Sequence, residues 1–366
     1  MQLRIPGPTP LPPAVRDALA RDMIDHRGPE FAALLRDVTS RLKPFFQTTN
    51  DVLILTASGT GALEAAIVNT LCPGDRVLAI TVGAFGDRFA EIAEVFGADV
   101  TRLAFAPGLA ADPAVVAEEF ESKGPFKAVL VTHNETSTGI TNDVEAIGQI
   151  VGPSSSLLIV DAISSLSSID LKSDAWGCDL VLSGSQKGWM VPPGLAMVSV
   201  SQKAWEAYAR ARMPRFYFDL GKAREMAERG QTPATPAVSL FYAMQAALLL
   251  MEREGMASIF ARHARCAERA RLGLRGLGLE LFADPLYASN TVTSVKAPPD
   301  VEVGWLLKDL RSRGVVLSGG QAALAGKIFR IGHLGFVDIP DIDEVLAALG
   351  AALASHRSVG STVSGG

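Results

Sequence analysis

The sequence predicts an α/β protein in which a large domain with a mostly parallel sheet precedes a smaller C-terminal α+β domain. Two observations support this prediction. Between residues 52 and 200, short aliphatic runs alternate with helical stretches, which is typical of parallel strands joined by covering helices. From about residue 237, a long helical stretch leads into shorter strand-like runs. The length of 366 residues suits about two domains.

The expected elements divide the chain into four parts. Residues 1–15 are expected to form an extended N-terminal arm, because proline fixes φ and removes a backbone donor. Residues 16–245 are assigned to the large domain and residues 246–355 to the small domain. The Ser- and Gly-rich end, 356–366, is expected to be disordered.

Apolar periodicity predicts the elements of the large domain in order. Its first helices are expected over 14–21 and 29–46. Strands follow over 52–56, 76–82, 100–105, 128–132, 157–160, 180–183 and 196–200. Helices between several of these strands are expected over 61–71, 88–96, 113–122 and 144–151. In a sheet of this kind, ligands bind beyond the carboxyl ends of the strands.

The C-terminal part begins with a strongly helical stretch over 237–277. Shorter β-like runs and helices come after it, which indicates an α+β arrangement. The strands are expected over 290–295, 315–317 and 328–331, and the helices over 303–313 and 342–354.

Charge and hydropathy limit the class of partner. The net charge is −5, which argues against a basic nucleic-acid binder and gives no reason to expect an anionic membrane as partner. The mean hydropathy of +0.24 is slightly high for a soluble monomer. A large core and a buried subunit interface are both compatible with it.

The cysteines and the N-terminus indicate a cytoplasmic protein. Cys72, Cys178 and Cys266 are scattered without metal-ligand spacing, so reduced thiols and no metal site are expected. The N-terminus lacks the apolar region of a secretory signal. The longest apolar stretch, 238–251, is too short to span a bilayer and is expected to be a buried helix.

A lysine and an aspartate follow neighbouring strands of the predicted sheet. Lys187 lies in SGSQKG, just past the strand 180–183, and the residues VPPG close its loop. Asp161 ends the strand 157–160, where a buried carboxylate is costly unless it is paired. Each has an ordinary interpretation, as a surface lysine and as a structural aspartate. Their functional interpretations are a Schiff-base amine and an acceptor for a protonated ring nitrogen.

A third feature, SGTG at 58–61, connects a strand to the start of a helix. Glycines allow close approach of the backbone, and a helix N-terminus offers free N–H groups, so this turn is suited to a phosphate. It is neither GxGxxG nor a P-loop, which argues against a nucleotide fold. A phosphate cradle, a ring-nitrogen carboxylate and a Schiff-base lysine together indicate pyridoxal 5′-phosphate (PLP).

Over nearly its whole length the chain resembles the class V PLP-dependent aminotransferases of fold type I. The resemblance is to the alanine–glyoxylate, serine–glyoxylate and serine–pyruvate aminotransferase group. It rests on ordered motifs: PGPT at 6–9, SGTGALEAA at 58–66, PGD at 73–75, GAFGDR at 83–88, HNETSTG at 133–139, VDAISS at 160–165, SGSQKG at 183–188 with PPG at 192–194, and FRIGHLG at 329–335.

The resemblance implies a role for each matching position. Lys187 would form an aldimine with PLP and Asp161 would hold the pyridine nitrogen protonated, so these two are the expected catalytic residues. Arg330 would bind the substrate α-carboxylate, a bidentate task suited to guanidinium. The other expected cofactor contacts are Ser58, Gly59 and Thr60 at the phosphate with Gln186 beside them, Phe85 on the ring, Thr136 near the phenolic oxygen, and Thr232 and Thr235 from the partner subunit of a homodimer.

Some positions keep a second interpretation. Phe85 would also suit the core, and Arg330 a structural ion pair. His133 and His333 are interpreted as structural histidines and are not assigned to catalysis. His26-Arg27 is equally compatible with a substrate entrance and with a feature of the helix start.

The expected reaction is a ping-pong transamination through Lys187. With Arg330 as the one obvious carboxylate contact and no second basic residue in an obvious active-site motif, the expected donor is alanine or serine. The expected acceptor is glyoxylate or pyruvate. Other donors, 2-aminoethylphosphonate or ureidoglycine, remain open. So do a cysteine desulfurase-like lyase, for which no cysteine has a suitable position, and a PLP scaffold without activity.

Overall fold

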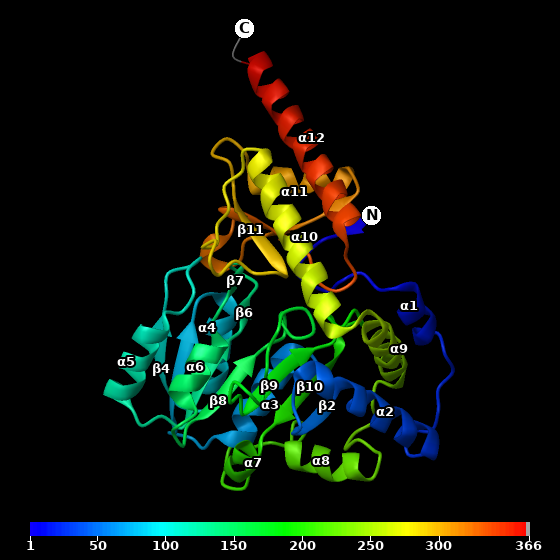
Figure 1. The fold of residues 1–366 in the computed structure, drawn as a ribbon, viewed down its shortest axis with the longest axis vertical. Helices are drawn as coiled ribbons and strands as arrows, with labels where there is room; N and C mark the ends of the chain where they lie inside the picture. Colours follow the sequence, from blue (N-terminus) through cyan, green and yellow to red (C-terminus); the bar gives the residue numbers. More distant parts are fainter. Residues whose placement is uncertain (364–366) are drawn as a thin grey trace.

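A seven-stranded sheet forms the centre of the large domain in this computed structural model, which describes residues 1–363 (Figure 1). The strand order is β2-β10-β9-β8-β5-β3-β4. Neighbours from β9 to β4 are parallel, whereas β10 runs antiparallel to both β9 and β2. The prediction of a mostly parallel sheet with covering helices is confirmed.

The strands and helices of the large domain follow the expected order. The strands are β2 (Asp51–Ala57), β3 (Arg76–Thr81), β4 (Asp99–Ala104), β5 (Ala128–Thr132), β6 (Asn134–Glu135), β7 (Ile140–Thr141), β8 (Leu157–Asp161), β9 (Leu180–Gly184) and β10 (Gly194–Val200). The helices are α1 (Pro13–Leu19), α2 (Pro29–Phe46), α3 (Gly59–Thr70), α4 (Ala84–Val95), α5 (Pro113–Lys123), α6 (Val144–Val151), α7 (Gln202–Tyr208), α8 (Leu220–Glu228) and α9 (Val238–Glu254).

Local capping explains where several helices begin. Ser58 accepts a hydrogen bond from the Gly61 N–H at the start of α3, and Asp143 accepts one from Ala146 at the start of α6. Ser201 and Asp219 do the same for α7 and α8. These two helices were not predicted, because they are short and lie between longer, strongly periodic stretches.

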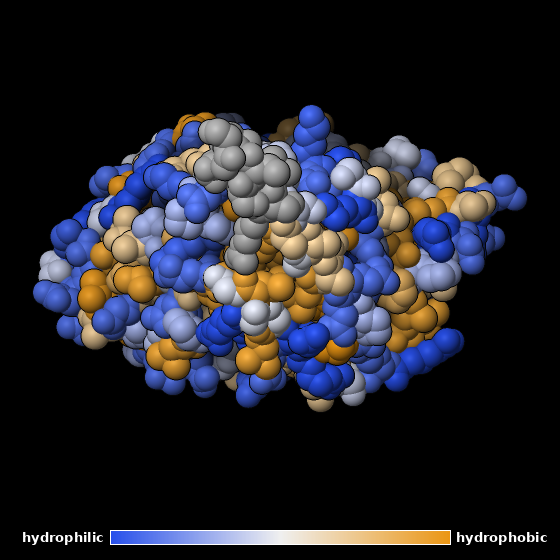
Figure 2. Space-filling model, turned by 90° about the horizontal axis from the view of Figure 1, so that it is seen from above, coloured by the Kyte–Doolittle hydropathy of each residue, from blue (hydrophilic) through white to orange (hydrophobic). Residues whose placement is uncertain are grey.

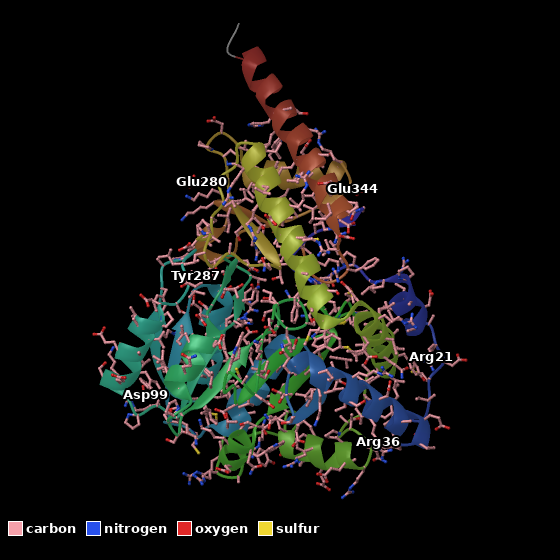
Figure 3. The ribbon with its side chains drawn as sticks, in the orientation of Figure 1. Arg21, Arg36, Asp99, Glu280, Tyr287 and Glu344 are labelled. Carbon is pink, nitrogen blue, oxygen red and sulfur yellow. The ribbon has the colours of Figure 1, made fainter. Side chains whose placement is uncertain are left out.

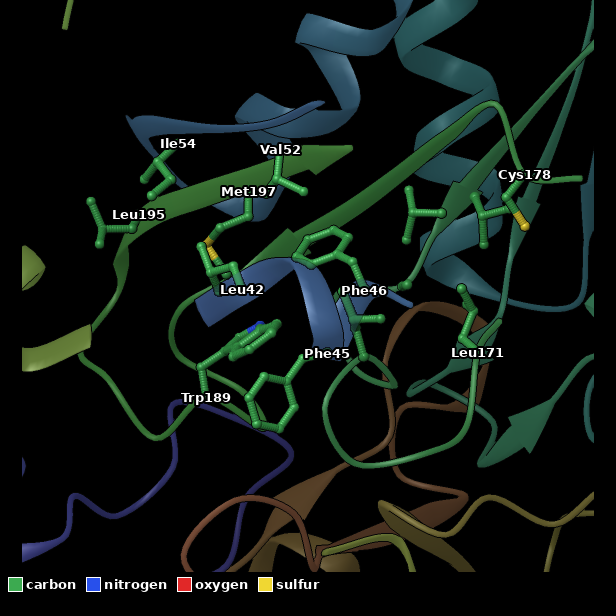
Figure 4. Packing of buried hydrophobic residues seen from close by; sticks show 14 of the residues in the cluster. Leu42, Phe45, Phe46, Val52, Ile54, Leu171, Cys178, Trp189, Leu195 and Met197 are labelled. Atoms are coloured by element: carbon green, nitrogen blue, oxygen red, sulfur yellow. The ribbon is translucent and has the colours of Figure 1, made fainter. Parts of the chain in front are cut away.

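The two faces of the sheet pack against separate hydrophobic clusters. One cluster joins α2 and α9 to the sheet, and the other joins α3, α4 and α7 to its opposite face. In the first cluster the buried Trp189 ring stacks on Phe46 and meets Phe45 edge-on, with ring centroids 6.0 and 5.9 Å apart (Figure 4). Trp189 follows Lys187 by two residues, so this packing anchors the loop that carries the lysine.

The small domain contains its own sheet and core. In its described part, β14 (Ile328–Gly332) lies between β11 (Val292–Lys296) and β13 (Ser318–Gly319), antiparallel to both. Its remaining elements are α10 (Met256–Gly276), α11 (Val303–Ser312), β12 (Val315–Val316), the 3₁₀ turn Ala322–Leu324 and α12 (Ile339–Val363). Seen from above, its surface mixes hydrophilic and hydrophobic residues (Figure 2).

The N-terminal arm connects the two domains. Its strand β1 (Gln2–Leu3) pairs in parallel with β12 of the small domain. Further along, the Thr9 N–H donates to the Gln186 carbonyl in the lysine loop of the large domain, at 3.2 Å. The arm therefore contacts both domains.

The C-terminal end differs from the expectation of a disordered tail over 356–366. Helix α12 continues through Val363, because no proline interrupts the segment after Ala354. Residues 364–366 lie outside the described residues. Among residues 1–363, no helix is long and apolar enough to cross a membrane.

Candidate active site

Lys187 lies in a tight loop after β9, and its partly buried side chain reaches the N-terminal arm. Lys187 Nζ donates to the Pro6 carbonyl of the N-terminal arm at 2.6 Å. The Ser185 hydroxyl donates to the Pro192 carbonyl at 2.6 Å, and the Trp189 indole N–H donates to the Ser183 hydroxyl at 2.8 Å. Burial lowers the pKa of the Lys187 amine to about 8.

The arm approaches Lys187 so closely that only glycine fits at position 7. A Cβ atom on Gly7 would lie 2.7 Å from Lys187 Cδ, and the φ angle of +131° disfavours any other residue. The PGPT motif at the N-terminus is therefore part of the lysine site.

A cavity of about 130 Å³ opens beside Lys187. It collects most of the positions that the sequence analysis assigned to the cofactor. Its lining contains Ser58, Gly59, Thr60, Leu63, Phe85, Arg88, Asn134, Thr136, Asp161, Ile163, Ser164, Gln186 and Lys187.

Asp161 occupies the carboxyl end of β8, next to β9 in the sheet. Its carboxylate accepts a hydrogen bond from the Ile163 N–H at 2.9 Å and is otherwise surrounded by buried groups. Burial raises the pKa of Asp161 to about 7, and the nearby Lys187 acts in the opposite direction. A buried carboxylate with so little compensation is suited to a cationic partner in the cavity.

The start of helix α3 also lines the cavity. The first N–H groups of a helix have no acceptor inside it, so those of Gly59 and Thr60 are available to an anion. A Cβ atom on Gly59 would lie 2.6 Å from Ile163 Cδ1. Within residues 1–363, the buried Gln186 Oε1 has no hydrogen-bond partner.

Glu135 is a buried carboxylate that the sequence analysis did not single out. It accepts hydrogen bonds from the N–H groups of Phe85 and Gly86 at 3.0 and 3.1 Å, and from the Ser137 hydroxyl at 2.6 Å. It therefore ties the segment that carries Phe85 to the turn that carries Thr136. The sequence feature that could have identified Glu135 is its position as the one carboxylate in the motif HNETSTG.

Arg330 lies behind Thr136 rather than in the lining of the cavity. Its guanidinium donates to the Thr136 carbonyl and to the Gly319 carbonyl, both at 2.9 Å. It is buried and has no ion pair within the described residues, so it is not the structural ion pair considered above. Its charge contributes to lowering the pKa of Lys187, which places it near the amine.

A second basic residue lines the cavity, although none was expected in an obvious active-site motif. Arg88 lines the cavity, because it follows Phe85 by one turn of α4. Its guanidinium carbon lies 5.0 Å from the centre of the Phe85 ring. Phe85 itself faces the cavity and is only partly buried.

Thr232 and Thr235 do not join the cavity within this chain. The Thr232 hydroxyl donates to the Ala234 carbonyl at 2.8 Å, and Thr235 is exposed. Arg27 donates to the Thr232 carbonyl at 2.8 Å, so His26-Arg27 lies beside this segment.

The two histidines left out of catalysis are fully buried and hydrogen-bonded. His133 contacts the Ser165 hydroxyl and His333 contacts Thr293. Burial lowers the pKa of His133 to about 4 and that of His333 to about 3. Neither lines the lysine cavity.

Residues 7–336 match the family model Aminotransferase class-V, and the chain belongs to this family. It is 36% identical to a serine–glyoxylate aminotransferase of Methylorubrum extorquens, over 98% of this chain and 90% of that protein. It is 47% identical to a protein named the small subunit of a soluble hydrogenase in Synechococcus sp., over 96% of this chain and 92% of that one.

Solved structures agree with this assignment. An alanine–glyoxylate aminotransferase from Nostoc sp. superposes with a TM-score of 0.93 at 32% identity, over 96% of this chain and 95% of that chain. The predicted family and fold type are therefore confirmed, and the protein is a PLP-dependent aminotransferase.

The cavity has the groups that PLP requires. Free helix N–H groups at Gly59 and Thr60 line it, and so does the poorly compensated Asp161 carboxylate. Lys187 supplies an amine with a lowered pKa to the same cavity. These residues fit a phosphate, a basic ring nitrogen and an aldehyde.

Asp161 is expected to make the cofactor-free protein less stable as the pH rises from about 4 to 7. Its folded pKa of about 7 exceeds its ordinary value of 3.8, so the folded state binds the proton more tightly in this window. The free energy of unfolding then falls with rising pH. Urea unfolding of the cofactor-free protein between pH 4 and 7 measures this slope.

The Asp161→Asn variant should lack this part of the slope, whereas Asp99→Asn, at the exposed start of β4, should retain it. An identical slope in wild type and Asp161→Asn would show that Asp161 does not titrate in this range.

Proposed function

We propose that the protein transfers the amino group of alanine or serine to glyoxylate or pyruvate. The observation behind this proposal is that Lys187 and Asp161 line one cavity at neighbouring strand ends. Arg330 does not line this cavity, but its guanidinium donates a hydrogen bond to the carbonyl of Thr136, which does.

The assigned roles follow from these positions. Ser58, Gly59, Thr60 and Gln186 would hold the phosphate of PLP, Phe85 would contact its ring, and Thr136 would bind near its phenolic oxygen. When bound, PLP supplies an aldehyde that takes up amino groups and a ring that withdraws electrons from the substrate Cα. Asp161 keeps the ring nitrogen protonated by offering a buried negative charge.

Lys187 moves the proton in this scheme. Its lowered pKa leaves a larger fraction of the amine unprotonated near neutral pH than an ordinary lysine has. Lys187 Nζ would accept the proton from the substrate Cα and donate it again later in the reaction, while PLP would supply the electron withdrawal that makes this proton acidic. The Pro6 carbonyl, 2.6 Å from Nζ, holds the amine in the cleft.

Arg330 is assigned to the substrate α-carboxylate. Backbone carbonyls at Thr136 and Gly319 orient the guanidinium without neutralising its charge, which leaves it able to bind an anion. Arg88 is exposed and stacks near Phe85, so it is not assigned to the substrate.

A cysteine-based lyase has little support in the structure. Cys178 and Cys266 are buried, and burial raises the pKa of both thiols. Cys72 lies at the end of α3 with its sulfur 3.4 Å from the Arg210 carbonyl. None of the described cysteines lines the lysine cavity.

Initial rates with pairs of donor and acceptor test the assigned reaction. Parallel lines in a double-reciprocal plot, with alanine or serine as donor and glyoxylate or pyruvate as acceptor, are expected from a ping-pong reaction. Higher kcat/KM with aspartate, 2-aminoethylphosphonate or ureidoglycine would contradict the assigned donors. Sulfide release from cysteine would indicate the lyase.

Replacing Arg330 by glutamine is expected to raise KM for the amino donor by about tenfold to a hundredfold, the value of a lost charge-assisted hydrogen-bond pair. Steady-state kinetics measure this change. Arg313→Gln is the matched control, because Arg313 pairs with Asp309 on the surface of α11. An unchanged KM in Arg330→Gln would remove Arg330 from substrate binding.

We also propose an active site completed by a second copy of the chain. Thr235 is exposed, and Phe216 and Tyr217 nearby in the sequence are 83% and 52% exposed, as expected for residues that a partner covers. The apolar stretch 238–251 offers less surface to a subunit interface than its composition suggested. Most of its large side chains pack inside the chain against α1 and α2.

A homodimeric mass is therefore expected in light scattering at micromolar concentration. A monomer with full activity would contradict the shared site. The expected cytoplasmic location is part of the same proposal, and fractionation of cells that produce the protein tests it.

A further inference from the structure

A second cavity, of about 440 Å³, lies between helix α10 and the loop that leads into β11. We call it the α10 cavity. It shares no lining residue with the lysine cavity. Figure 3 shows Tyr287, from this loop, where the small domain meets β7. The Tyr287 carbonyl accepts from Thr141 N–H at 2.8 Å, and Ser289 N–H donates to Gly139 at 2.8 Å, so both domains fix the loop.

Two arginines face the α10 cavity from one wall. Arg271 and Arg275 are four residues apart on α10, so they lie on the same side of the helix. Within residues 1–363 neither forms an ion pair. Arg271 donates to neutral groups, the Ser289 carbonyl at 3.0 Å and the Asn290 side-chain oxygen at 3.4 Å.

The charges of this wall are not balanced. Burial, with a contribution from Arg275, lowers the pKa of Arg271. Glu268 is the one carboxylate of the described lining, which leaves a positive excess. An anion between the two guanidiniums would relieve their repulsion and the cost of burying Arg271.

Ser294, which also belongs to the lining, has an unsatisfied hydroxyl within the described residues. It is 1% exposed, and its hydroxyl has no hydrogen-bond partner in the described part of the chain. Gly139 closes over it, since a Cβ atom there would lie 3.0 Å from Ser294 Oγ. An unpaired buried hydroxyl is costly, and an acceptor atom in the cavity would satisfy it.

The remaining walls indicate an organic anion. Leu272, Leu281 and Val292 offer apolar surface between the polar ends. The volume is many times the roughly 30 Å³ that one water molecule occupies in the liquid. We propose that the α10 cavity binds a small dicarboxylate, with one carboxylate at Arg271 and Ser294, the other at Arg275, and the methylene chain on the apolar wall.

Calorimetric titration of the PLP-loaded enzyme with succinate tests this site. Succinate has no amino or keto group, so it is not consumed. Saturable binding is expected. It should weaken at least tenfold in Arg271→Ala and severalfold in Ser294→Ala, and change less than twofold in Arg265→Ala, an exposed position of α10 outside the lining. Titration of Arg330→Gln separates this binding from succinate in the substrate cleft.

Three results would overturn the proposal. They are the absence of saturable succinate binding, equal affinities in Arg271→Ala and Arg265→Ala, and inorganic phosphate binding as tightly as succinate. Melting temperatures verify that each variant is folded. If Arg271→Ala does not fold, Arg275→Gln takes its place with the same expected loss.

Discussion

Lys187→Ala is expected to remove covalent PLP attachment and to lower turnover by about 10⁴-fold, the upper range for a proton-transferring group. Lys187 is the lysine that lines the cavity with Asp161, and desolvation lowers its pKa to about 8. Borohydride reduction followed by mass spectrometry measures the attachment. The wild-type chain should gain the mass of the cofactor, and the variant should not.

Lys172→Ala is the matched control, because Lys172 is exposed and outside the cavity. It should retain both attachment and turnover. Covalent cofactor in the reduced Lys187→Ala variant would show that another lysine holds PLP.

Asp161→Asn is expected to leave PLP attached but to lower turnover by about 10³-fold, comparable to the loss of a preorganised electrostatic group. Asparagine fits the space of the aspartate but has no charge to keep a ring nitrogen protonated. The carboxylate is well placed for this task, because it is buried and has few compensating hydrogen bonds. The visible absorbance of the bound cofactor, together with kcat, separates attachment from turnover.

Asp99→Asn serves as the control for a lost surface carboxylate at the exposed start of β4. Near-normal kcat in Asp161→Asn would exclude Asp161 from the reaction. Loss of the cofactor from this variant would instead indicate that Asp161 acts in binding alone.

The sequence was sufficient to predict the central sheet because its strands, apart from the edge strand β4, are mostly buried and therefore read as apolar runs. All seven expected strands of the large domain form, and α2 and α6 have the predicted bounds. Helices α7 and α8 were missed because Gln202–Tyr208 and Leu220–Glu228 are short, and their stability comes from capping and from packing against the rest of the domain.

Those residues of the candidate site that lie at the end of a strand could be predicted from the sequence. Asp161 and Lys187 follow strands, so their meeting in one cavity could be inferred from the parallel sheet. Arg88 and Glu135 could not be inferred in this way. Arg88 reaches the cavity through the turn of α4, and Glu135 acts through hydrogen bonds to Phe85 and Gly86, residues far away in the sequence.

The contact between Pro6 and Lys187 was also beyond the sequence. The arm reaches the lysine only because β1 pairs with β12 and Thr9 bonds to the lysine loop. The path of an extended segment depends on tertiary contacts, which local patterns do not encode.

The half-reaction of the PLP-loaded enzyme with single amino acids tests the proposed function most directly. Mixing with alanine, serine, glycine, glutamate or 2-aminoethylphosphonate, without any acceptor, is followed by the visible absorbance of the bound cofactor. The absorbance is expected to disappear fastest with alanine or serine and to return on addition of glyoxylate or pyruvate. An unchanged spectrum with alanine and serine, with a full response to another donor, would contradict the proposed substrate class.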